Sequence, residues 1–425
     1  MTGAEMQALI ADLYPICRSI TGDGLRETLR RLRAVVPLEI REVPSGTAVL
    51  DWTVPKEWNI RDAYVADRSG KRVIDFRASN LHVLNYSTPV RACLPLAELR
   101  PHLHTLPDHP DWVPYRTSYY TEAWGFCAAQ RVVDALAPGD YEVVIDSTLA
   151  PGALSYGELV LPGETADEVL VSCHTCHPSL ANDNLSGIAV AVALARALAA
   201  RSARRFTYRF LFIPGTIGSI TWLATHRDVI PRIRHGLVLS CLGDAGGFTY
   251  KRSRRGDAPV DRAVAHVLRH GGAPHRLRDF VPYGYDERQY CSPGFDLPVG
   301  CLTRTPNGEY PEYHTSADNL DLVRPDALEA SRSVLETVCA VLEGDARYRN
   351  TSPYGEPQLG RRGLYTATGG AARLPGFEFA LLWVLNFSDG AHSLLDIAER
   401  AGLPFAALRA AADALLKAGL LEVVA

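Results

Sequence analysis

The sequence predicts an α/β protein in which helices flank a mostly parallel sheet, with a small all-β insertion and a C-terminal winged helix. Three observations lead to this prediction: buried strands alternate with helices in the middle of the chain, an aromatic-rich β segment precedes them, and a helix-rich unit follows. A chain of 425 residues is too long for one small core. The expected parts are an α/β domain at 1–40 and 135–345, the β insertion at 41–134, a linker at 346–370 and the winged helix at 371–425.

The first part of the chain predicts two helices and then a β unit. Residues 4–36 are expected to form helices separated at SITGDG, where two glycines interrupt the pattern. Short stretches such as AYVADRSGKRVIDF and LHVLNYS then alternate polar and apolar side chains, as paired strands do. We interpret the aromatic residues of WVPYRTSYYTEAWGF as the core of this unit, with Arg116, Tyr119 and Tyr120 at its rim. A roof over the functional site is the alternative.

From residue 135 to 345, apolar strands alternate with helices. DEVLVSC, RFTYRFLFIPG, HGLVLSCLGD and DLPVGCLTR are apolar runs typical of strands buried on both faces. LSGIAVAVALARALAARSA and RPDALEASRSVLETVCAVLEG are long predicted helices. In such sheets, ligands bind where strands end and helices begin. Residues at those ends are therefore the candidate site.

The composition argues against several classes of protein. A net charge of −4 gives no overall attraction to nucleic acid or to an anionic membrane. Nine cysteines are an odd number without a framework spacing, which argues against a disulfide-stapled secreted protein. The N-terminus lacks the pattern of a signal peptide, and no run of about eighteen apolar residues occurs. We therefore expect a cytoplasmic protein that does not enter a membrane.

Residues 371–425 predict three helices and a strand, the order of a winged helix. Four basic and six acidic side chains make this unit acidic. Because phosphate contacts need a basic face, we expect no nucleic-acid binding and interpret the unit as an interaction module. The winged helix or the β insertion is the expected surface for forming homo-oligomers.

SCHTCHPSLANDNLSG places two histidines and an aspartate close to a strand end. His174 follows the apolar run EVLVSC, Asp183 precedes a long helix, and His314 lies far downstream in EYHTSADN. Two imidazoles and a carboxylate from separate loops suit a zinc ion that keeps an open position for water. Such an ion lowers the pKa of its water and polarises a carbonyl group. His177 is a further candidate ligand.

Two motifs, SCHTCHPSLANDNLSGIAVAVALA and YHTSADN, resemble the two halves of the zinc aminopeptidase signature. More closely, the whole chain resembles a bacterial family of aminopeptidase-like proteins with an inserted β domain and a C-terminal winged helix. DWTVPKEWNIRDAYV, DERQYCSPGFDLPVG and EYHTSADNLD carry this closer match. The resemblance implies the zinc-aminopeptidase fold and hydrolysis of a peptide or amide bond.

The chain departs from the zinc aminopeptidases at the positions of other metal ligands. Those enzymes bind two zinc ions with paired glutamates and a further acidic residue, where this chain has Gly215, Thr216 and Ser240, with Asp244 four residues late. Too few carboxylates would leave the charge of a second ion uncompensated. We therefore predict one zinc ion per chain. The predicted ligands are His174, Asp183 and His314, with His177 either a fourth ligand or a hydrogen-bond partner of a ligand.

Cys173 and Cys176 flank His174 in a C-x-x-C spacing. A thioredoxin-like redox pair opens a helix, whereas this pair closes a strand, and a zinc ribbon needs a second pair that the sequence lacks. Cys176 stands where the zinc aminopeptidases have an aspartate. We interpret both cysteines as packed near the metal, with a thiolate ligand at Cys176 as the alternative.

The missing glutamates also remove the usual general base, which takes a proton from water and passes it to the leaving amine. Glu287 in YGYDERQYCSPG is the favoured replacement, and Asp286 and Glu312 are the alternatives. The non-functional interpretation is that Asp286, Glu287 and Arg288 form a solvated charge cluster or a structural ion pair. Arg288 either binds a substrate carboxylate in bidentate fashion or pairs with Asp286. The other candidates for substrate contact are Tyr313 and Arg116.

We therefore expect a zinc-dependent hydrolase that cleaves a peptide or amide bond in a small substrate. Two other classes of protein fit the same sequence. One is a catalytically impaired aminopeptidase-like protein that serves for binding or as a scaffold, and the lost carboxylates favour it. The other is a regulator that senses a ligand through the hydrolase fold and binds DNA through the winged helix, and the acidic winged helix argues against it.

Overall fold

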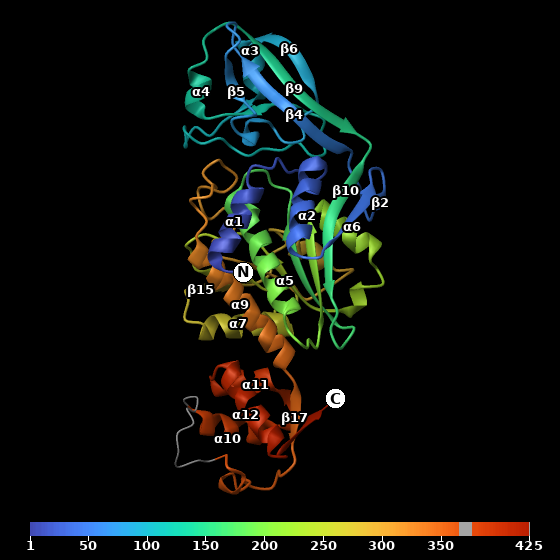
Figure 1. The fold of residues 1–425 in the computed structure, drawn as a ribbon, viewed down its shortest axis with the longest axis vertical. Helices are drawn as coiled ribbons and strands as arrows, with labels where there is room; N and C mark the ends of the chain where they lie inside the picture. Colours follow the sequence, from blue (N-terminus) through green and yellow to red (C-terminus); the bar gives the residue numbers. More distant parts are fainter. Residues whose placement is uncertain (365–375, 425) are drawn as a thin grey trace. The chain divides into compact units, whose positions relative to one another are not determined.

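The computed structural model describes residues 1–364 and 376–424 (Figure 1). Residues 365–375 lie outside the described residues, and with them the end of the expected linker and the start of the expected winged helix. The chain divides into two compact units, Met1–Ala258 with Pro274–Ser333, and Pro259–Ala273 with Val334–Ala425. In the described ranges, no helix combines the length and the apolar character needed to cross a bilayer.

The first unit contains an eight-stranded sheet. Its strands are β1 (Glu39–Pro44), β10 (Ala153–Leu161), β11 (Glu168–His174), β12 (Thr207–Ile213), β13 (Ile233–Leu239), β14 (Phe248–Lys251), β15 (His275–Arg278) and β16 (Val299–Thr303). Their order across the sheet is β1-β10-β12-β11-β13-β16-β14-β15. The four central strands β12, β11, β13 and β16 are parallel, and antiparallel pairings attach β10 and β14 at either side. The sheet is thus mixed, with its parallel part at the centre.

The central strands are buried because their side chains are apolar on both faces. β11 and β12 contain no exposed residue, as expected for parallel strands covered by helices. Helix α5 (Gly187–Ala199) contacts β11, β12 and β13, and Figure 1 shows it crossing in front of these strands. Helix α2 (Asp23–Val35) contacts β10, and α1 (Gly3–Leu13) packs on α5. This packing places the end of β11 and the start of α5 at one edge of the sheet.

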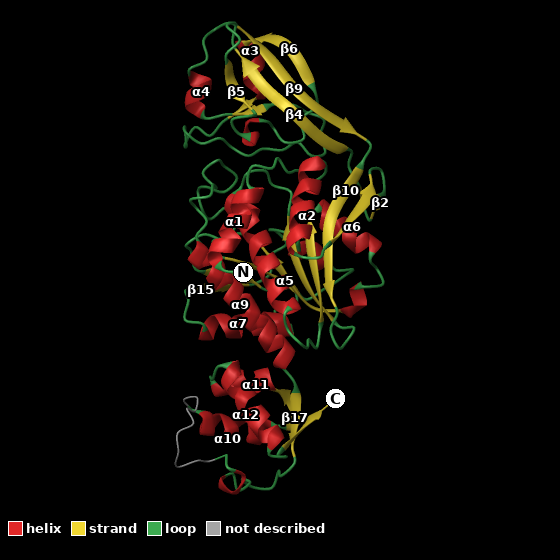
Figure 2. Cartoon of the chain, in the orientation of Figure 1, coloured by secondary structure: helices red, strands yellow, loops and turns green. Residues whose placement is uncertain are grey.

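A separate antiparallel sheet has the order β5-β4-β9-β6 (Figure 2). Its strands are β4 (Glu57–Ala66), β5 (Arg72–Asp75), β6 (Val90–Pro95) and β9 (Asp140–Ala150). β9 begins after residue 134, the expected end of the insertion, yet it pairs with β4 and β6 of this sheet. The short elements before β9 are β2 (Ala48–Val49), β3 (Trp52–Thr53), β7 (Leu103–His104), β8 (Phe126–Cys127), α3 (Leu96–Leu99) and α4 (Gln130–Asp134). Two further short helices of the first unit, α6 (Ile217–Thr225) and α8 (Glu287–Tyr290), lie later in the chain.

A buried ion triad links three neighbouring strands of the large sheet. Arg209 in β12 donates from Nε to Glu168 Oε2 in β11 at 2.7 Å, and from Nη1 to Glu158 Oε1 in β10 at 2.5 Å. Trp222 Nε1 also donates to Glu158 Oε1, at 3.1 Å. The strand order, with β12 between β10 and β11, places one guanidinium between two carboxylates.

We expect Arg209→Met to lower the free energy of unfolding by about 3–5 kcal/mol, because it removes the guanidinium to which both buried carboxylates are hydrogen-bonded. Arg41 and Arg232 lie farther away, at 3.6 Å from Glu158 and 4.0 Å from Glu168. Urea unfolding followed by circular dichroism measures this loss. The matched control is Arg61→Met, which breaks an exposed pair with Asp146 and should cost at most about 1 kcal/mol. Equal losses in both variants would contradict the buried assignment of the triad.

In its described residues, the second unit contains a three-stranded sheet in the order β18-β17-β19, packed with helices. Its elements are β17 (Arg347–Asn350), α10 (Phe377–Phe387), β18 (Asp389–Ser393), α11 (Leu394–Ala401), α12 (Phe405–Lys417) and β19 (Leu421–Val424). β17 lies in the segment expected to be a linker, yet it pairs with both β18 and β19. Helix α7 (Pro259–His270) and the end of α9 (Pro325–Gly344) belong to the same unit, and the Phe405 N–H donates to His266 Nε2 at 3.0 Å.

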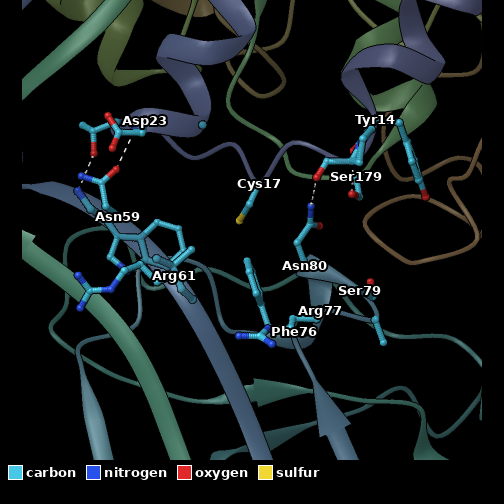
Figure 3. A pocket seen from close by; sticks show the side chains of 16 residues that line it. Tyr14, Cys17, Asp23, Asn59, Arg61, Phe76, Arg77, Ser79, Asn80 and Ser179 are labelled. Atoms are coloured by element: carbon cyan, nitrogen blue, oxygen red, sulfur yellow. Dashed lines mark hydrogen bonds between the residues drawn. The ribbon is translucent and has the colours of Figure 1, made fainter.

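A cavity of about 640 Å³ in the first unit is lined by the end of α1, by β4 and by residues 76–80 (Figure 3). Asn80 Nδ2 donates to the Pro15 carbonyl at 3.2 Å, and Ser179 Oγ donates to the Tyr14 carbonyl at 2.8 Å. These bonds hold the end of α1 against neighbouring loops. The cavity wall includes none of the predicted metal ligands.

Candidate metal centre

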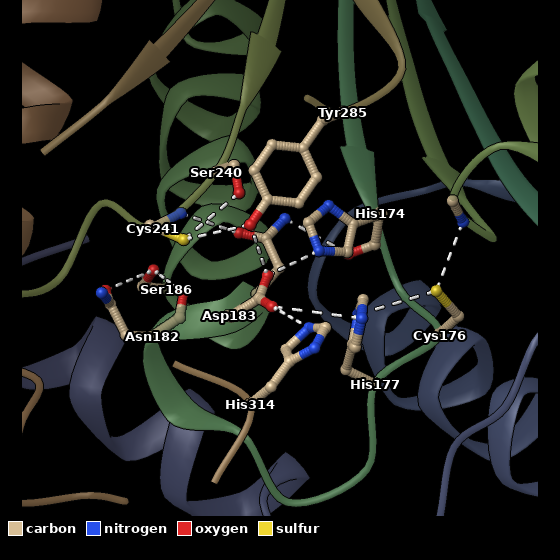
Figure 4. A network of polar contacts seen from close by, with 12 residues as sticks. His174, Cys176, His177, Asn182, Asp183, Ser186, Ser240, Cys241, Tyr285 and His314 are labelled. Atoms are coloured by element: carbon tan, nitrogen blue, oxygen red, sulfur yellow. Dashed lines mark hydrogen bonds and ion pairs between the residues drawn. The ribbon is translucent and has the colours of Figure 1, made fainter. Parts of the chain in front are cut away.

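Segments distant in sequence meet at the carboxyl end of β11 (Figure 4). His174 is the last residue of β11, and His177 lies in the loop that follows. Asp183 lies in the helical turn Ala181–Ser186, which leads into α5. His314 lies in the loop between β16 and α9. Figure 4 shows the three imidazoles arranged around the Asp183 carboxylate.

The Asp183 carboxylate is the centre of this group. His174 Nε2 is 2.8 Å from Asp183 Oδ1, and His314 Nε2 is 3.0 Å from Asp183 Oδ2. His177 Nε2 is 4.0 Å from the same Oδ2. The possible ligand atoms of His174, His177 and Asp183 all lie within 4.8 Å of one another. The structure therefore brings together all four residues that the sequence predicts as ligands.

The donor atoms of this group fit a divalent cation. Asp183 Oδ2 and His314 Nε2 are buried, and among the described residues neither has a partner with hydrogen-bond geometry. A tetrahedral zinc ion with ligands at about 2.0–2.1 Å separates neighbouring ligand atoms by roughly 3.4 Å. The observed distances of 2.8, 3.0 and 4.0 Å lie on both sides of that value. Imidazole nitrogen and carboxylate oxygen are also the donors that zinc prefers.

Burial and mutual contacts set the charges of these side chains. Burial by itself would raise the pKa of Asp183, but the neighbouring histidines outweigh it and hold that pKa well below its usual value. Burial lowers the pKa of His177 well below its usual value. An ionised carboxylate and a neutral imidazole are the protonation states that metal ligands require.

Tyr285 contacts two of these residues and was not among the predicted site residues. Its ring stacks on the His174 imidazole with 4.6 Å between centroids, and its hydroxyl donates to Asp183 Oδ1 at 3.2 Å. The Cys241 Sγ atom is 3.5 Å from the same hydroxyl. Tyr285 immediately precedes the predicted Asp286 and Glu287, but a tyrosine by itself does not indicate a metal site.

Asp318 fixes the turn that carries Asp183, and sequence reasoning missed it as well. Its carboxylate accepts the backbone N–H of Asn182 at 2.6 Å and that of Asp183 at 3.0 Å. The Tyr310 hydroxyl donates to the same carboxylate at 3.3 Å. Burial raises the pKa of Asp318 to about 7. The signal was its place four residues after His314 in YHTSADN.

An aromatic side chain from the inserted segment covers the imidazoles. The Tyr115 ring lies 5.2 Å from the His177 ring and 5.1 Å from the His314 ring. Its backbone N–H donates to the His314 carbonyl at 2.8 Å, and its hydroxyl bonds to that of Tyr119 at 2.6 Å. The interpretation of this stretch as core alone is therefore incomplete, because Tyr115 also contacts two imidazoles of the site. Arg116, the predicted substrate contact, is exposed.

Neither Gly215 nor Asp244 supplies the group with a further carboxylate of the kind that zinc aminopeptidases use. A side chain at Gly215 would lie 3.6 Å from His174 Cβ, but glycine offers no ligand there. The Asp244 carboxylate accepts from Asn182 Nδ2 at 3.1 Å and from Thr305 Oγ1 at 2.6 Å, so it holds loops together. Among the described residues, Asp183 is the one carboxylate of the group that could hold a metal ion.

Backbone strain concentrates around this group. The φ angles are +37° at Ser179, +61° at Thr216, +47° at Cys241 and +57° at His314. Residues other than glycine seldom adopt this region, which costs on the order of 1–3 kcal/mol each and clusters at functional sites. The surrounding structure therefore holds the loops around Asp183 in backbone conformations that these residues would not favour by themselves.

The three predicted general bases have different surroundings. Asp286 is buried, and its Oδ1 accepts the Thr216 N–H at 2.6 Å and the Ser219 hydroxyl at 3.1 Å, at the start of α6. Burial raises the pKa of Asp286. Glu287 is fully buried and pairs with Lys251. Glu312 is half-buried, two residues before His314.

The two remaining predicted contacts are Tyr313 and Arg288. The Tyr313 ring stacks on the His314 imidazole with 3.9 Å between centroids, so it lies at the site. Arg288 lies in α8, and its buried Nε has no hydrogen-bond partner among the described residues. Tyr313 thus lies beside a candidate ligand. Arg288 Nε makes no hydrogen bond to Asp286, so this atom does not support the expected pairing of the two residues.

Cys176 packs beside the group as a neutral thiol. Its Sγ accepts the Gly215 N–H at 3.3 Å and lies 3.7 Å from His177 Nδ1. Burial raises the pKa of the Cys176 thiol to about 12, and within the described chain all cysteines are free. These surroundings fit the packing interpretation, because a reactive thiol needs a lowered pKa.

Known families cover nearly the whole chain. Residues 7–345 match a family described as a domain of unknown function (DUF4910), and residues 346–423 match a winged helix-turn-helix family. A protein of Clostridium acetobutylicum is 51% identical over 423 residues, covering 100% of this chain and 97% of that protein. Its provisional name is polysaccharide biosynthesis protein with aminopeptidase-like domain. The expected resemblance to aminopeptidase-like proteins with a winged helix is confirmed.

Solved structures share the fold. One from Clostridium acetobutylicum, provisionally named a peptidase, has a TM-score of 0.95 at 50% identity and covers 99% of this chain and 96% of that one. A zinc aminopeptidase from Bacillus subtilis has a TM-score of 0.58 at 13% identity, covering 80% and 94%. A peptidase M28 precursor from Shewanella amazonensis has a TM-score of 0.57 at 13% identity, covering 80% and 92%. The zinc-aminopeptidase-like fold is therefore confirmed.

Proposed function

This chain belongs to the DUF4910 family, and from that premise we propose that it is a metal-dependent hydrolase that cleaves a peptide or amide bond in a small substrate. One observation carries the proposal: a buried carboxylate, Asp183, lies among three imidazoles at the carboxyl end of a central strand. Open α/β sheets bind ligands at this edge. The shared fold with a zinc aminopeptidase of Bacillus subtilis supports the reaction class.

Zinc is the proposed metal, with one ion per chain. His174, Asp183 and His314 would hold it, and His177 is a fourth ligand or a hydrogen-bond partner of a ligand. When bound, zinc supplies an activated water molecule and a Lewis acid for the carbonyl oxygen. The side chains of the protein then orient the substrate and move one proton.

We propose Asp286 as the group that moves this proton, in preference to Glu287. Two hydrogen bonds to Oδ1 fix its carboxylate at Thr216, in the loop where zinc aminopeptidases have their glutamates, and no hydrogen bond of the described residues uses Oδ2. Burial raises the pKa of Asp286 toward the range of an effective base. Glu287 instead forms an ion pair with Lys251.

The proposed reaction consumes one water molecule. Its oxygen forms a bond with the carbonyl carbon, the carbon–nitrogen bond breaks, and a proton passes through Asp286 to the leaving nitrogen. The products are a carboxylic acid and an amine. Tyr115, which roofs the imidazoles, would exclude bulk water, and Tyr313 would contact the substrate beside His314.

A catalytically impaired binding protein is the second candidate function. The observation that favours it is the lack of carboxylates at Gly215, Thr216 and Ser240, while Asp244 is bonded elsewhere. Such a protein would keep the fold and the metal without turnover. For either function, the name of the Clostridium acetobutylicum relative suggests the biosynthesis of a polysaccharide as the process served.

The winged helix is proposed to bind protein, either another copy of this chain or a different partner. Helix α12 carries only Arg409 and Lys417 as basic residues, and Arg409 pairs with Asp413 at 2.6 Å. This leaves little positive charge for phosphate contacts, so neither DNA binding nor the regulator function is proposed. The free cysteines of the described chain fit the reducing environment of the cytoplasm, where we propose that the protein acts.

Zinc removal tests the proposal. After treatment with a chelator, the melting temperature and the hydrolysis of aminoacyl or dipeptide amides should both fall, and added zinc should restore them. Free zinc at about 100 times its Kd stabilises the folded state by about 2.7 kcal/mol. Differential scanning calorimetry and product analysis measure the two effects. Stabilisation by zinc without hydrolysis would favour the binding protein, and no effect of zinc would contradict both functions.

A further inference from the structure

A cavity of about 560 Å³ lies beside the metal centre, walled by residues of β14, β15 and β16 and by the loop before α8. Tyr285 belongs to both places: its hydroxyl donates to Asp183 Oδ1 at 3.2 Å, and its side chain lines the cavity. The volume falls in the range of ligand pockets, roughly 300–1,000 Å³. A molecule in the cavity would therefore contact a side chain that also contacts the candidate ligand Asp183.

Every charged side chain that is described in the cavity wall has an opposite charge beside it. Lys251 pairs with Glu287, Arg278 pairs with Glu309, and Asp279 pairs with Arg252 at 3.1 Å. An ammonium group in the cavity would meet two cations, and a carboxylate or phosphate would meet three anions, and each like-charge approach costs free energy. The wall therefore suits an uncharged ligand with polar groups.

Two buried oxygen atoms in the wall have no hydrogen-bond partner among the described residues, although the Glu287 carboxylate is paired with Lys251. Thr249 is 3% exposed and Glu287 is fully buried, and among the described residues neither Thr249 Oγ1 nor Glu287 Oε2 has a hydrogen-bond partner. Such atoms are rare in folded proteins, because a buried polar atom without a partner destabilises the fold. A hydroxyl group both donates and accepts, so neighbouring hydroxyls on one ligand would pair with Glu287, Lys251 and Thr249 together.

Two tyrosines and a glycine also line the cavity. Tyr283 is 74% exposed, and Tyr283 and Tyr285 present ring surfaces on which the apolar face of a saturated ring can pack. Gly284 lies between them with φ of +139°, and a Cβ atom there would come within 2.6 Å of Lys251 Nζ and 2.7 Å of Glu287 Oε1. Glycine thus allows the ion pair to lie directly against the backbone that carries both tyrosines.

We propose that this cavity binds the hydroxyl-bearing ring of a sugar, and that the substrate is an N-acylated amino sugar whose amide reaches the metal centre. The substrate assignment rests on the proposed hydrolase function, whereas ring binding does not. The acyl carbon–nitrogen bond breaks, the acyl carbon takes the oxygen of water, and the sugar amine leaves with a proton. The products are a carboxylic acid and an amino sugar.

Calorimetric titration of the full chain with N-acetylglucosamine, glucose and N-acetylalaninamide tests this inference. The two sugars should bind and compete with each other, and the amide without a ring should not displace glucose. Thr249→Val, which keeps the side-chain shape, should weaken sugar binding about 5- to 10-fold through loss of one hydrogen bond. The matched control is Thr221→Val in α6, since Thr221 Oγ1 is also buried without a partner among the described residues but lies outside the cavity.

The outcomes separate this inference from the proposed function. Sugar binding that persists after chelation and weakens in Thr249→Val supports the cavity assignment. If no amide is hydrolysed in the same experiments, the hydrolase function is overturned and the cavity assignment stands. Hydrolysis of dipeptide amides without sugar binding would overturn the cavity assignment and leave the hydrolase in place. Equal affinities in the two valine variants would also overturn it. If Thr249→Val does not fold, Glu287→Gln provides the same comparison.

Discussion

Replacing His174 with alanine is expected to lower the zinc content from about one ion per chain to near zero and to abolish amide hydrolysis. His174 Nε2 lies 2.8 Å from Asp183 Oδ1, and both side chains are buried. An exposed side chain therefore cannot replace His174 as a ligand beside Asp183. A bound metal contributes several kcal/mol to stabilising the charge of the transition state. The loss of activity should therefore be about a thousandfold or more.

Elemental analysis of purified protein and an amide hydrolysis assay measure the two losses. The matched control is His275→Ala, which removes an exposed histidine of β15, outside the candidate centre. It should keep both zinc and activity. Circular dichroism of each variant shows whether the fold is intact. A folded His174→Ala protein with a full complement of zinc would place the metal at other residues.

Asp286→Asn is expected to lower kcat by about 10²–10⁴-fold while leaving the zinc content unchanged. Asparagine keeps an Oδ1 acceptor for the Thr216 N–H and the Ser219 hydroxyl, so the start of α6 should remain in place. The amide side chain cannot accept the proton that the proposed reaction transfers. Loss of rate with retained metal thus distinguishes a base from a ligand.

The pH profile gives a second measurement on the same variant. A base works only when deprotonated, and burial raises the pKa of Asp286 above the usual value of an aspartate. The wild-type rate should therefore fall as the pH decreases through that raised pKa, and Asp286→Asn should lose this acidic limb. Glu312→Gln is the comparison, because Glu312 is the other acidic candidate near His314. A large loss of kcat in Glu312→Gln together with normal turnover in Asp286→Asn would contradict the assignment.

Local patterns in the sequence were enough to predict the layers of the α/β domain. Strands buried on both faces must be apolar throughout, as β11 and β12 are. The same patterns place His174 at a strand end and Asp183 before a long helix. β9 and β17 extend past the expected boundaries because each strand pairs with segments far away in the chain, where no local pattern marks them.

The sequence by itself determined which residue types with metal-binding chemistry lie at strand and helix ends, since spacing and apolar runs set secondary structure. Only the tertiary structure decided that His314 reaches Asp183, that Tyr285 and Tyr115 enclose the imidazoles, and that Asp318 holds the turn. It also separated two adjacent acids, since Asp286 accepts hydrogen bonds from α6 while Glu287 pairs with Lys251. Successive side chains at a helix start point in different directions, and the surrounding elements determine what each one meets.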